Sequence, residues 1–97
     1  MVNAEDLSAR YSPARAKIYR RLLAGRQPWT VKQLHEELAD ESISAEAARA
    51  TLYVLLGERL VEPVRGERVL TVILNDAGTD YLRRVLKGWA HREEARP

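Results

Sequence analysis

The sequence predicts a mainly α-helical fold with one small β-hairpin, and three observations support this class. Apolar residues recur at helical spacing in four segments beyond residue 12, and capping residues precede three of them. A stretch rich in β-branched residues over 61–74 is interrupted by a glycine turn, as a hairpin requires. The 97 residues suffice for one modest hydrophobic core, so we expect a single domain over residues 1–97.

The first two predicted helices lie in the N-terminal third of the chain. A short leading helix is expected from Asn3, its cap, to about Arg10. The next helix has a sharper start, because Ser12 is a capping hydroxyl and Pro13 takes the first helical position. It continues to Gly25, with a basic outer face that carries Arg15, Lys17, Arg20 and Arg21.

A pair of helices separated by a tight turn is predicted next. Thr30 and Gln33 form a capping box that begins a helix ending near Asp40. The turn spans residues 41–43, and its last residue, Ile43, is expected in the core.

Ser44 caps the second helix of this pair, which ends near Gly57. Its buried stripe consists of Ala48, Leu52, Leu55 and Leu56. Its open face consists of Ala45, Glu46, Arg49, Ala50 and Tyr53.

A hairpin and a terminal helix complete the predicted order. The strands are expected at 61–64 and 69–74, joined by a two-residue turn at Gly66 and Glu67 that Arg65 and Arg68 flank. A break that begins at Asn75 precedes a helix over 77–90, and the charged segment 91–97 is expected to fray. One side of this helix is apolar, through Tyr81, Leu82, Val85, Leu86 and Trp89. Because so small a domain has little interior, we expect this side to form a homodimer contact.

Charge is unevenly distributed along the chain although the formal total is only +2. Residues 1–26 hold six basic and two acidic residues, a net charge of +4. Residues 27–62, which contain the predicted helix pair, hold three basic and seven acidic residues, a net charge of −4. Residues 63–97 hold seven basic and five acidic residues, a net charge of +2. A surface that binds DNA needs local positive potential, so this distribution matters more than the total.

The segment from Thr30 to about Leu86 resembles the winged helix-turn-helix of small prokaryotic regulators, chiefly the multiple-antibiotic-resistance-regulator (MarR) and PadR-like groups. Ser44, Leu55 and the pair Leu60–Val61 stand in the register of that pattern, with Arg59 where glycine is usual. The exit from the hairpin, residues 74–78, is similar to a leucine-threonine-x-x-glycine step, with asparagine in place of threonine.

This resemblance implies sequence-specific binding of double-stranded DNA by a homodimeric transcriptional regulator. The second helix of the pair would enter the major groove, where Glu46, Arg49 and Tyr53 would read bases. Ala45 and Ala50 would permit close approach, and Ser44 would contact a phosphate. Arg65 and Arg68 would contact phosphates or the minor groove, and Arg15 would add a backbone contact. The terminal helix would form the dimer.

Two alternatives remain open at this level. The acidic charge of residues 27–62 favours a winged helix that binds another protein, since carboxylates facing phosphates repel them. An architectural or recombination-accessory DNA-binding role is equally compatible with the pattern.

Several function classes lack support in the sequence. It contains no phosphate-binding glycine loop, nucleophile motif or metal-spaced cluster, so we expect no enzyme activity, cofactor or metal. Cysteine is absent, no apolar run reaches the ~18 residues of a membrane helix, and no signal peptide is recognisable. We therefore expect a cytoplasmic protein with no membrane association.

Overall fold

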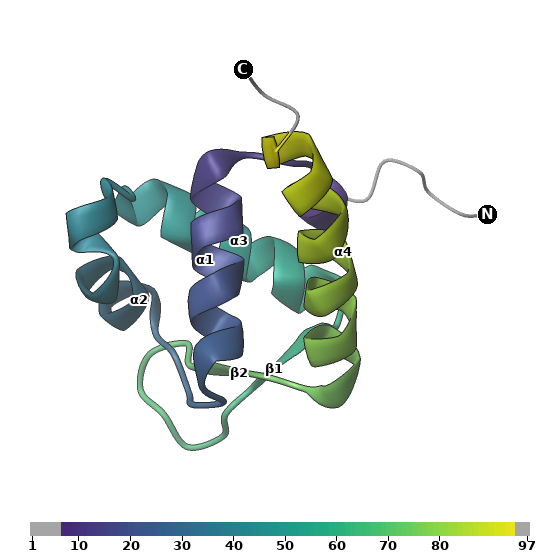
Figure 1. Cartoon of the computed structure of the whole chain (residues 1–97). Coiled ribbons are helices and arrows are strands. Elements are labelled where there is room, and N and C mark those ends of the chain that lie inside the picture. The colour runs from purple at the N-terminus through teal and green to yellow at the C-terminus, as the bar shows by residue number, and fades with distance from the viewer. Residues whose placement is uncertain (1–6, 95–97) are drawn as a thin grey trace.

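The computed structural model describes residues 7–94, which form a mainly helical fold with one two-stranded antiparallel sheet (Figure 1). The elements follow in the order η1 (Leu7–Ala9), α1 (Pro13–Ala24), α2 (Val31–Glu37), η2 (Ala39–Glu41), α3 (Ala45–Gly57), β1 (Val61–Pro63), β2 (Val72–Leu74) and α4 (Asp76–Glu94), where η denotes a 3-10 helix. The predicted class, mainly α with a small hairpin, is confirmed. The predicted leading helix from Asn3 lies partly outside the described residues, and η1 is its described part.

The helix starts follow from the capping residues. The Ser12 hydroxyl accepts the Arg15 amide at 3.0 Å, and Pro13 begins α1. Thr30 and Gln33 form the reciprocal capping box at the start of α2. The Ser44 hydroxyl accepts an amide of α3, that of Ala47, at 3.0 Å. Each cap satisfies a backbone amide that would otherwise lack a partner in the first turn.

The helices pack around α1. Figure 1 shows α1 between α2 and α4, with α3 crossing behind it, and the tightest packing joins α1 to α4 and α2 to α3. The core is built from buried apolar residues of all four α-helices and both strands, with Ile43 supplied by the turn between α2 and α3. α3 therefore has one face fixed in the core and the other free.

The small sheet lies at the lower end of the molecule as drawn in Figure 1. β1 pairs with β2 so that Val61 is opposite Leu74 and Pro63 is opposite Val72. On the other side of β2, Trp29 exchanges two backbone hydrogen bonds with Val72, of 2.8 and 2.9 Å. β2 is thus central, and the connector between α1 and α2 is tied to the hairpin.

The hairpin is shorter and its loop longer than the sequence suggested. Residues 64–71 form a loop, so the predicted strand 69–74 is correct only for its second half. The last backbone hydrogen bond between the two arms of the hairpin joins the Val64 amide to the Thr71 carbonyl at 2.7 Å. Val69 and Leu70 have strand-forming side chains, but strand propensity is realised only beside a partner strand, and here the chain leaves the sheet.

The terminal helix is longer than predicted. Asn75 caps it, because its side-chain oxygen accepts the Gly78 amide at 2.7 Å, so α4 begins at Asp76 rather than at residue 77. It continues to Glu94, beyond the predicted end at residue 90. Glu93 accepts hydrogen bonds from Tyr11 at 3.0 Å and Arg20 at 2.9 Å, so residues 91–94, the described part of the segment expected to fray, are helical and tied to α1 and the residue before it.

The apolar side of α4 faces inward, which corrects its predicted role. Leu82 and Trp89 are 0 and 5% exposed, and the Trp89 ring stacks on Tyr19 with centroids 5.4 Å apart. Leu82 and Trp89 therefore belong to the core of the single chain and are not available for a dimer contact. Tyr81, Val85 and Leu86 are only partly buried, and a contact through them stays a prediction.

Within residues 7–94, no helix is both long and apolar enough to cross a membrane.

Candidate nucleic-acid interface

The outer face of α3 is open to solvent. All five residues predicted for this face are exposed, namely Ala45, Glu46, Arg49, Ala50 and Tyr53. Arg49 and Tyr53 are one helical turn apart, and Ala45 lies one turn before Arg49, so these three form a stripe along the helix. Small side chains beside a long cation and an aromatic ring give a surface that can approach another molecule closely. Ser44 is also exposed, although its hydroxyl is engaged in capping α3.

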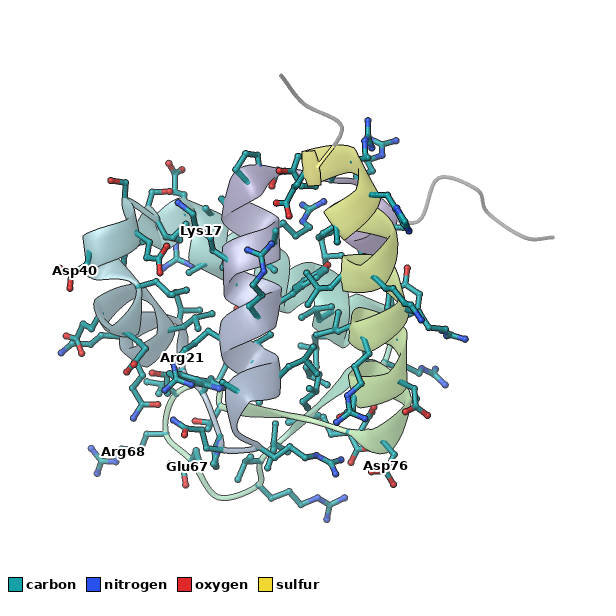
Figure 2. All side chains as sticks on the ribbon, in the orientation of Figure 1. Lys17, Arg21, Asp40, Glu67, Arg68 and Asp76 are labelled. Carbon is teal, nitrogen blue, oxygen red and sulfur yellow. The ribbon has the colours of Figure 1, made fainter. Side chains whose placement is uncertain are left out.

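The loop 64–71 supplies the second part of the surface. Arg65 and Arg68 are both exposed, and Gly66 between them takes a left-handed conformation with φ of 85°. Figure 2 shows the Arg68 side chain projecting from this loop away from the body of the protein. The predicted two-residue turn is displaced by one residue, because the turn falls at Arg65 and Gly66 rather than at Gly66 and Glu67.

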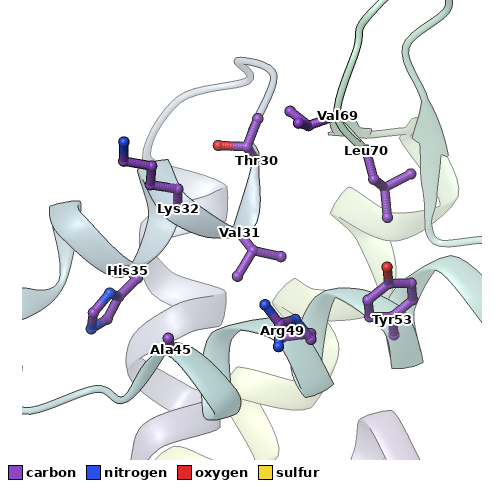
Figure 3. Close-up of a pocket in the computed structure, with 9 residues that line it drawn as sticks. All are labelled: Thr30, Val31, Lys32, His35, Ala45, Arg49, Tyr53, Val69 and Leu70. Carbon is purple, nitrogen blue, oxygen red and sulfur yellow. The ribbon is translucent and has the colours of Figure 1, made fainter.

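A groove of about 470 Å³ runs between α2, the outer face of α3 and the loop 64–71 (Figure 3). Its lining residues are Thr30, Val31, Lys32, His35, Ala45, Arg49, Tyr53, Val69 and Leu70. Figure 3 shows Val31 above Arg49 and Leu70 above Tyr53. The groove joins the exposed stripe of α3 to Val69 and Leu70 of the loop, whereas Arg65 and Arg68 are not among its lining residues.

Six groove residues were not anticipated as functional from the sequence, among them Lys32, His35, Val69 and Leu70. Lys32 and His35 lie on α2 at i and i+3, and they face the groove because α2 packs against the start of α3. Helical spacing alone could have placed these two residues on one face of α2, but it could not have shown that this face lies beside α3. Val69 and Leu70 were assigned to a strand, and their exposure depends on where the chain leaves the sheet.

The basic face of α1 is paired with acidic residues of the α2 region. Lys17 lies 3.6 Å from Glu41, and Arg21 lies 3.1 Å from Glu37. Figure 2 shows Lys17 and Arg21 on the side of α1 toward α2. The basic segment 1–26 and the acidic segment 27–62 are thus joined by ion pairs within the same chain. Each of these partly exposed pairs contributes at most about 1 kcal/mol to the free energy of unfolding.

Two further carboxylates of the acidic segment also have partners away from the groove. Glu58 accepts hydrogen bonds from the amide and hydroxyl of Ser8, and Glu62 accepts one from the side-chain amide of Asn75 at 3.3 Å. No carboxylate is among the nine residues that line the groove. The acidity of residues 27–62 is therefore not concentrated at the α3 surface, although Glu46 remains exposed on it.

Arg15 has a structural position, and its DNA contact stays a prediction. Its guanidinium donates to the carbonyl of Leu7 at 2.6 Å and to that of Arg10 at 3.0 Å. These bonds hold η1 against the start of α1. Both bonds come from the Nη1 atom of the guanidinium.

Among residues 7–94, no group of three or more His, Asp or Glu side chains is placed to hold a metal ion. Comparison of the chain with protein-family models, curated proteins and solved structures found no match.

Proposed function

We propose that this protein binds double-stranded DNA in a sequence-specific manner as a small transcriptional regulator. In this proposal α2 and α3 act as a helix-turn-helix, α3 enters the major groove, and the loop 64–71 acts as a wing over the adjacent backbone. An α-helix fits the major groove, and the 13 residues of α3 span about 20 Å.

The observation that carries the proposal is the continuous surface formed by α3, the loop and α2. The Arg49 side chain is exposed on α3 beside two exposed alanines, and it has no hydrogen bond or ion pair to another described residue. Free arginine at such a position is suited to the O6 and N7 acceptors of guanine. Arg68 and Lys32 lie on the flanking elements, where the phosphates on either side of a groove would pass.

The remaining contacts follow from side-chain chemistry. Glu46 would accept a hydrogen bond from a cytosine amino group, while Ala50 and Tyr53 would make apolar contact with a thymine methyl. Arg65 joins Arg68 on the wing. Two copies bound to an inverted repeat would read both half-sites, whether they associate before or upon binding DNA.

The proposal is tested by selecting bound duplexes from a random library and by comparing two variants. Arg49→Ala should weaken binding by about 1–3 kcal/mol and relax the preference at one base pair. Arg68→Ala should weaken binding to all sequences alike and reduce the salt slope by about one. Arg83→Ala, which removes an exposed arginine on α4, is the matched control and should change neither quantity.

The selection also distinguishes the alternatives. An enriched sequence supports a regulator, whereas DNA that is retained and bent without enrichment supports an architectural role. Exposed Val69 and Leu70 favour a second candidate, a protein-interaction module, because large apolar side chains on a surface often mark such contacts. Failure to retain any DNA near physiological salt would reject DNA binding and favour that module.

A further inference from the structure

The outer side of α4 is a basic surface. Residues 81–92 hold four basic residues and no acidic one, and all four are exposed: Arg83, Arg84, Lys87 and Arg92. The guanidinium groups of Arg84 and Arg92 each lie over a tyrosine ring, 5.9 and 5.6 Å from its centroid. Arg83 and Lys87 lie one helical turn apart, and neither forms an ion pair or hydrogen bond within residues 7–94. Asp80, one turn before Arg83, is exposed and pairs with neither.

The α2 side of the molecule carries an acidic surface. Residues 36–41 hold four acidic residues and no basic one, and all four are exposed: Glu36, Glu37, Asp40 and Glu41. Glu37 and Glu41 pair with arginine and lysine of α1, as described above. Glu36 and Asp40, four positions apart, have no such partner in the described part of the chain. Each surface therefore has two charges engaged within the chain and two that are free.

The two surfaces lie on opposite sides of the molecule. Figure 1 shows α2 and α4 on either side of α1, and Figure 2 shows Asp40 at the outer edge on the α2 side. The free carboxylates of one chain therefore do not meet the free cations of the same chain. They are available to the cations of another copy.

We propose that copies of this chain associate head to tail, with the acidic surface of one copy against the basic surface of the next. In this contact Glu36 and Asp40 pair with Arg83 and Lys87. The two sets match in number and in spacing along the chain, and they are opposite in sign. A symmetric contact of either surface with its own copy would instead bring like charges together, which repel.

Small residues beside both free pairs permit a close approach. Ala39 lies between the two carboxylates and is exposed. Gly88 follows Lys87, and a Cβ at Gly88 would meet nothing within 4 Å. The two backbones can therefore come near enough for the charged side chains to reach across. Because each copy uses two different surfaces, the contact leaves one of each free and can repeat along a row of copies.

The contact is expected to be weak and sensitive to salt. Exposed ion pairs are individually weak, and the Debye length falls from about 30 Å at 0.01 M ionic strength to about 3 Å at 1 M. We therefore expect association at high chain concentration near the lower ionic strength and its loss near the higher one. All measurements are made without DNA, so their outcome does not depend on the proposed function.

A spin label locates the contact in the otherwise unaltered chain. The sequence has no cysteine, so Ala39→Cys provides a single attachment site on the acidic surface. The labelled chain is mixed at low ionic strength with isotope-labelled wild-type chain, whose amide signals are recorded. The signals of residues 83–88 should lose the most intensity and should regain it at high salt. Loss centred on residues 36–41, or no loss, would overturn the proposal.

Two double variants each reverse one surface. Arg83→Glu with Lys87→Glu makes both surfaces acidic, and Glu36→Lys with Asp40→Lys makes both basic. Each variant alone should lose the association, so its mean mass by light scattering should fall to that of a single chain. An equimolar mixture of the two should recover the association, because every contact between unlike copies again joins opposite charges.

The matched control changes the net charge equally at another place. Arg65→Glu with Arg68→Glu lies on the loop 64–71 and should associate as the wild-type chain does. Thermal unfolding of each variant establishes that the fold is retained. Loss of association in the control, association that survives either surface reversal, or a mixture that does not recover it would overturn the head-to-tail contact.

Discussion

Arg59 occupies a backbone conformation that few side chains adopt, with φ of 61°. It follows the end of α3, where a left-handed residue turns the chain toward β1, and its carbonyl accepts the Asn75 side chain at 3.0 Å. The left-handed region costs an L-residue roughly 1–2 kcal/mol because Cβ approaches the carbonyl oxygen, whereas glycine avoids this contact. This explains why glycine is usual at this point of the winged-helix pattern that the sequence resembles.

We expect Arg59→Gly to raise the free energy of unfolding by about 0.5–1 kcal/mol. This is the net effect of two terms: glycine relieves the backbone strain, but it also increases the entropy of the unfolded chain. Urea denaturation measures the change. Arg59→Ala removes the same charge but keeps Cβ, so it should give no comparable gain. Equal stabilisation by both variants would show that charge, not backbone conformation, is responsible.

Tyr19 belongs to a buried polar cluster that links α1, η1, α3 and α4. Its hydroxyl donates to the Ser8 carbonyl at 2.8 Å, while the Ser8 hydroxyl lies within hydrogen-bond distance of Glu58 and, at 2.9 Å, of Tyr81. Burial raises the pKa of the Tyr19 hydroxyl, since the phenolate would be poorly solvated in the core. The folded protein therefore retains this proton at pH values where the unfolded chain releases it.

This difference predicts a loss of stability at alkaline pH. The full contribution of Tyr19 is present below its unfolded pKa of about 10 and declines as pH rises above it, by up to about 1.4 kcal/mol per pH unit. Tyr19→Phe should be less stable at neutral pH, having lost the bond to Ser8, but its stability should decline less steeply above pH 10. Parallel declines in denaturation experiments over that range would contradict the assignment.

At the scale of elements, α4 carries two glycines with opposite surroundings. A Cβ on Gly78 would overlap the Leu60 carbonyl and lie 2.8 Å from Leu74 Cδ1, so glycine lets α4 approach the chain before β1. A Cβ on Gly88 would meet nothing within 4 Å.

Replacing each by alanine should therefore have opposite effects. Gly78→Ala should destabilise the fold by about 1–3 kcal/mol through overpacking. Gly88→Ala should stabilise it by up to about 1 kcal/mol, because alanine is the better helix former. The two urea midpoints measure this contrast, and a destabilised Gly88→Ala would mean that its open side is covered by something absent from the single chain.

Elements with local signals were predicted better than those that depend on distant partners. The three capping sequences at Ser12, Thr30 and Ser44 placed the starts of α1, α2 and α3 correctly, because a cap involves only residues within one turn. The length of β2 was wrong, since strand pairing depends on how β1 and Trp29 lie beside it. The roles of Leu82 and Trp89 were wrong for the same reason: periodicity identifies an apolar face but not what covers it.

For the whole molecule, the distribution of exposed apolar residues predicts the association state. α4 presents no large exposed apolar residue within the described part of the chain, while the groove presents three. We therefore expect a dimer formed through the half-buried residues of α4 to be weak, so that the mass measured by light scattering approaches 11.1 kDa on dilution. A mass twice as large that Val85→Glu reduces, but Lys87→Glu does not, would restore α4 as a dimer contact.

The sequence by itself determined the helical class, the starts of α1, α2 and α3, and the exposed face of α3, because capping and periodicity are local properties. It also placed the two arginines of the loop at a solvent-exposed turn. Only the tertiary structure decided that α1 forms ion pairs with two carboxylates of the acidic segment, that the Trp89 side of α4 is internal, and that Lys32, His35, Val69 and Leu70 join α3 in one groove. These features depend on contacts between residues distant in sequence, which no local pattern specifies.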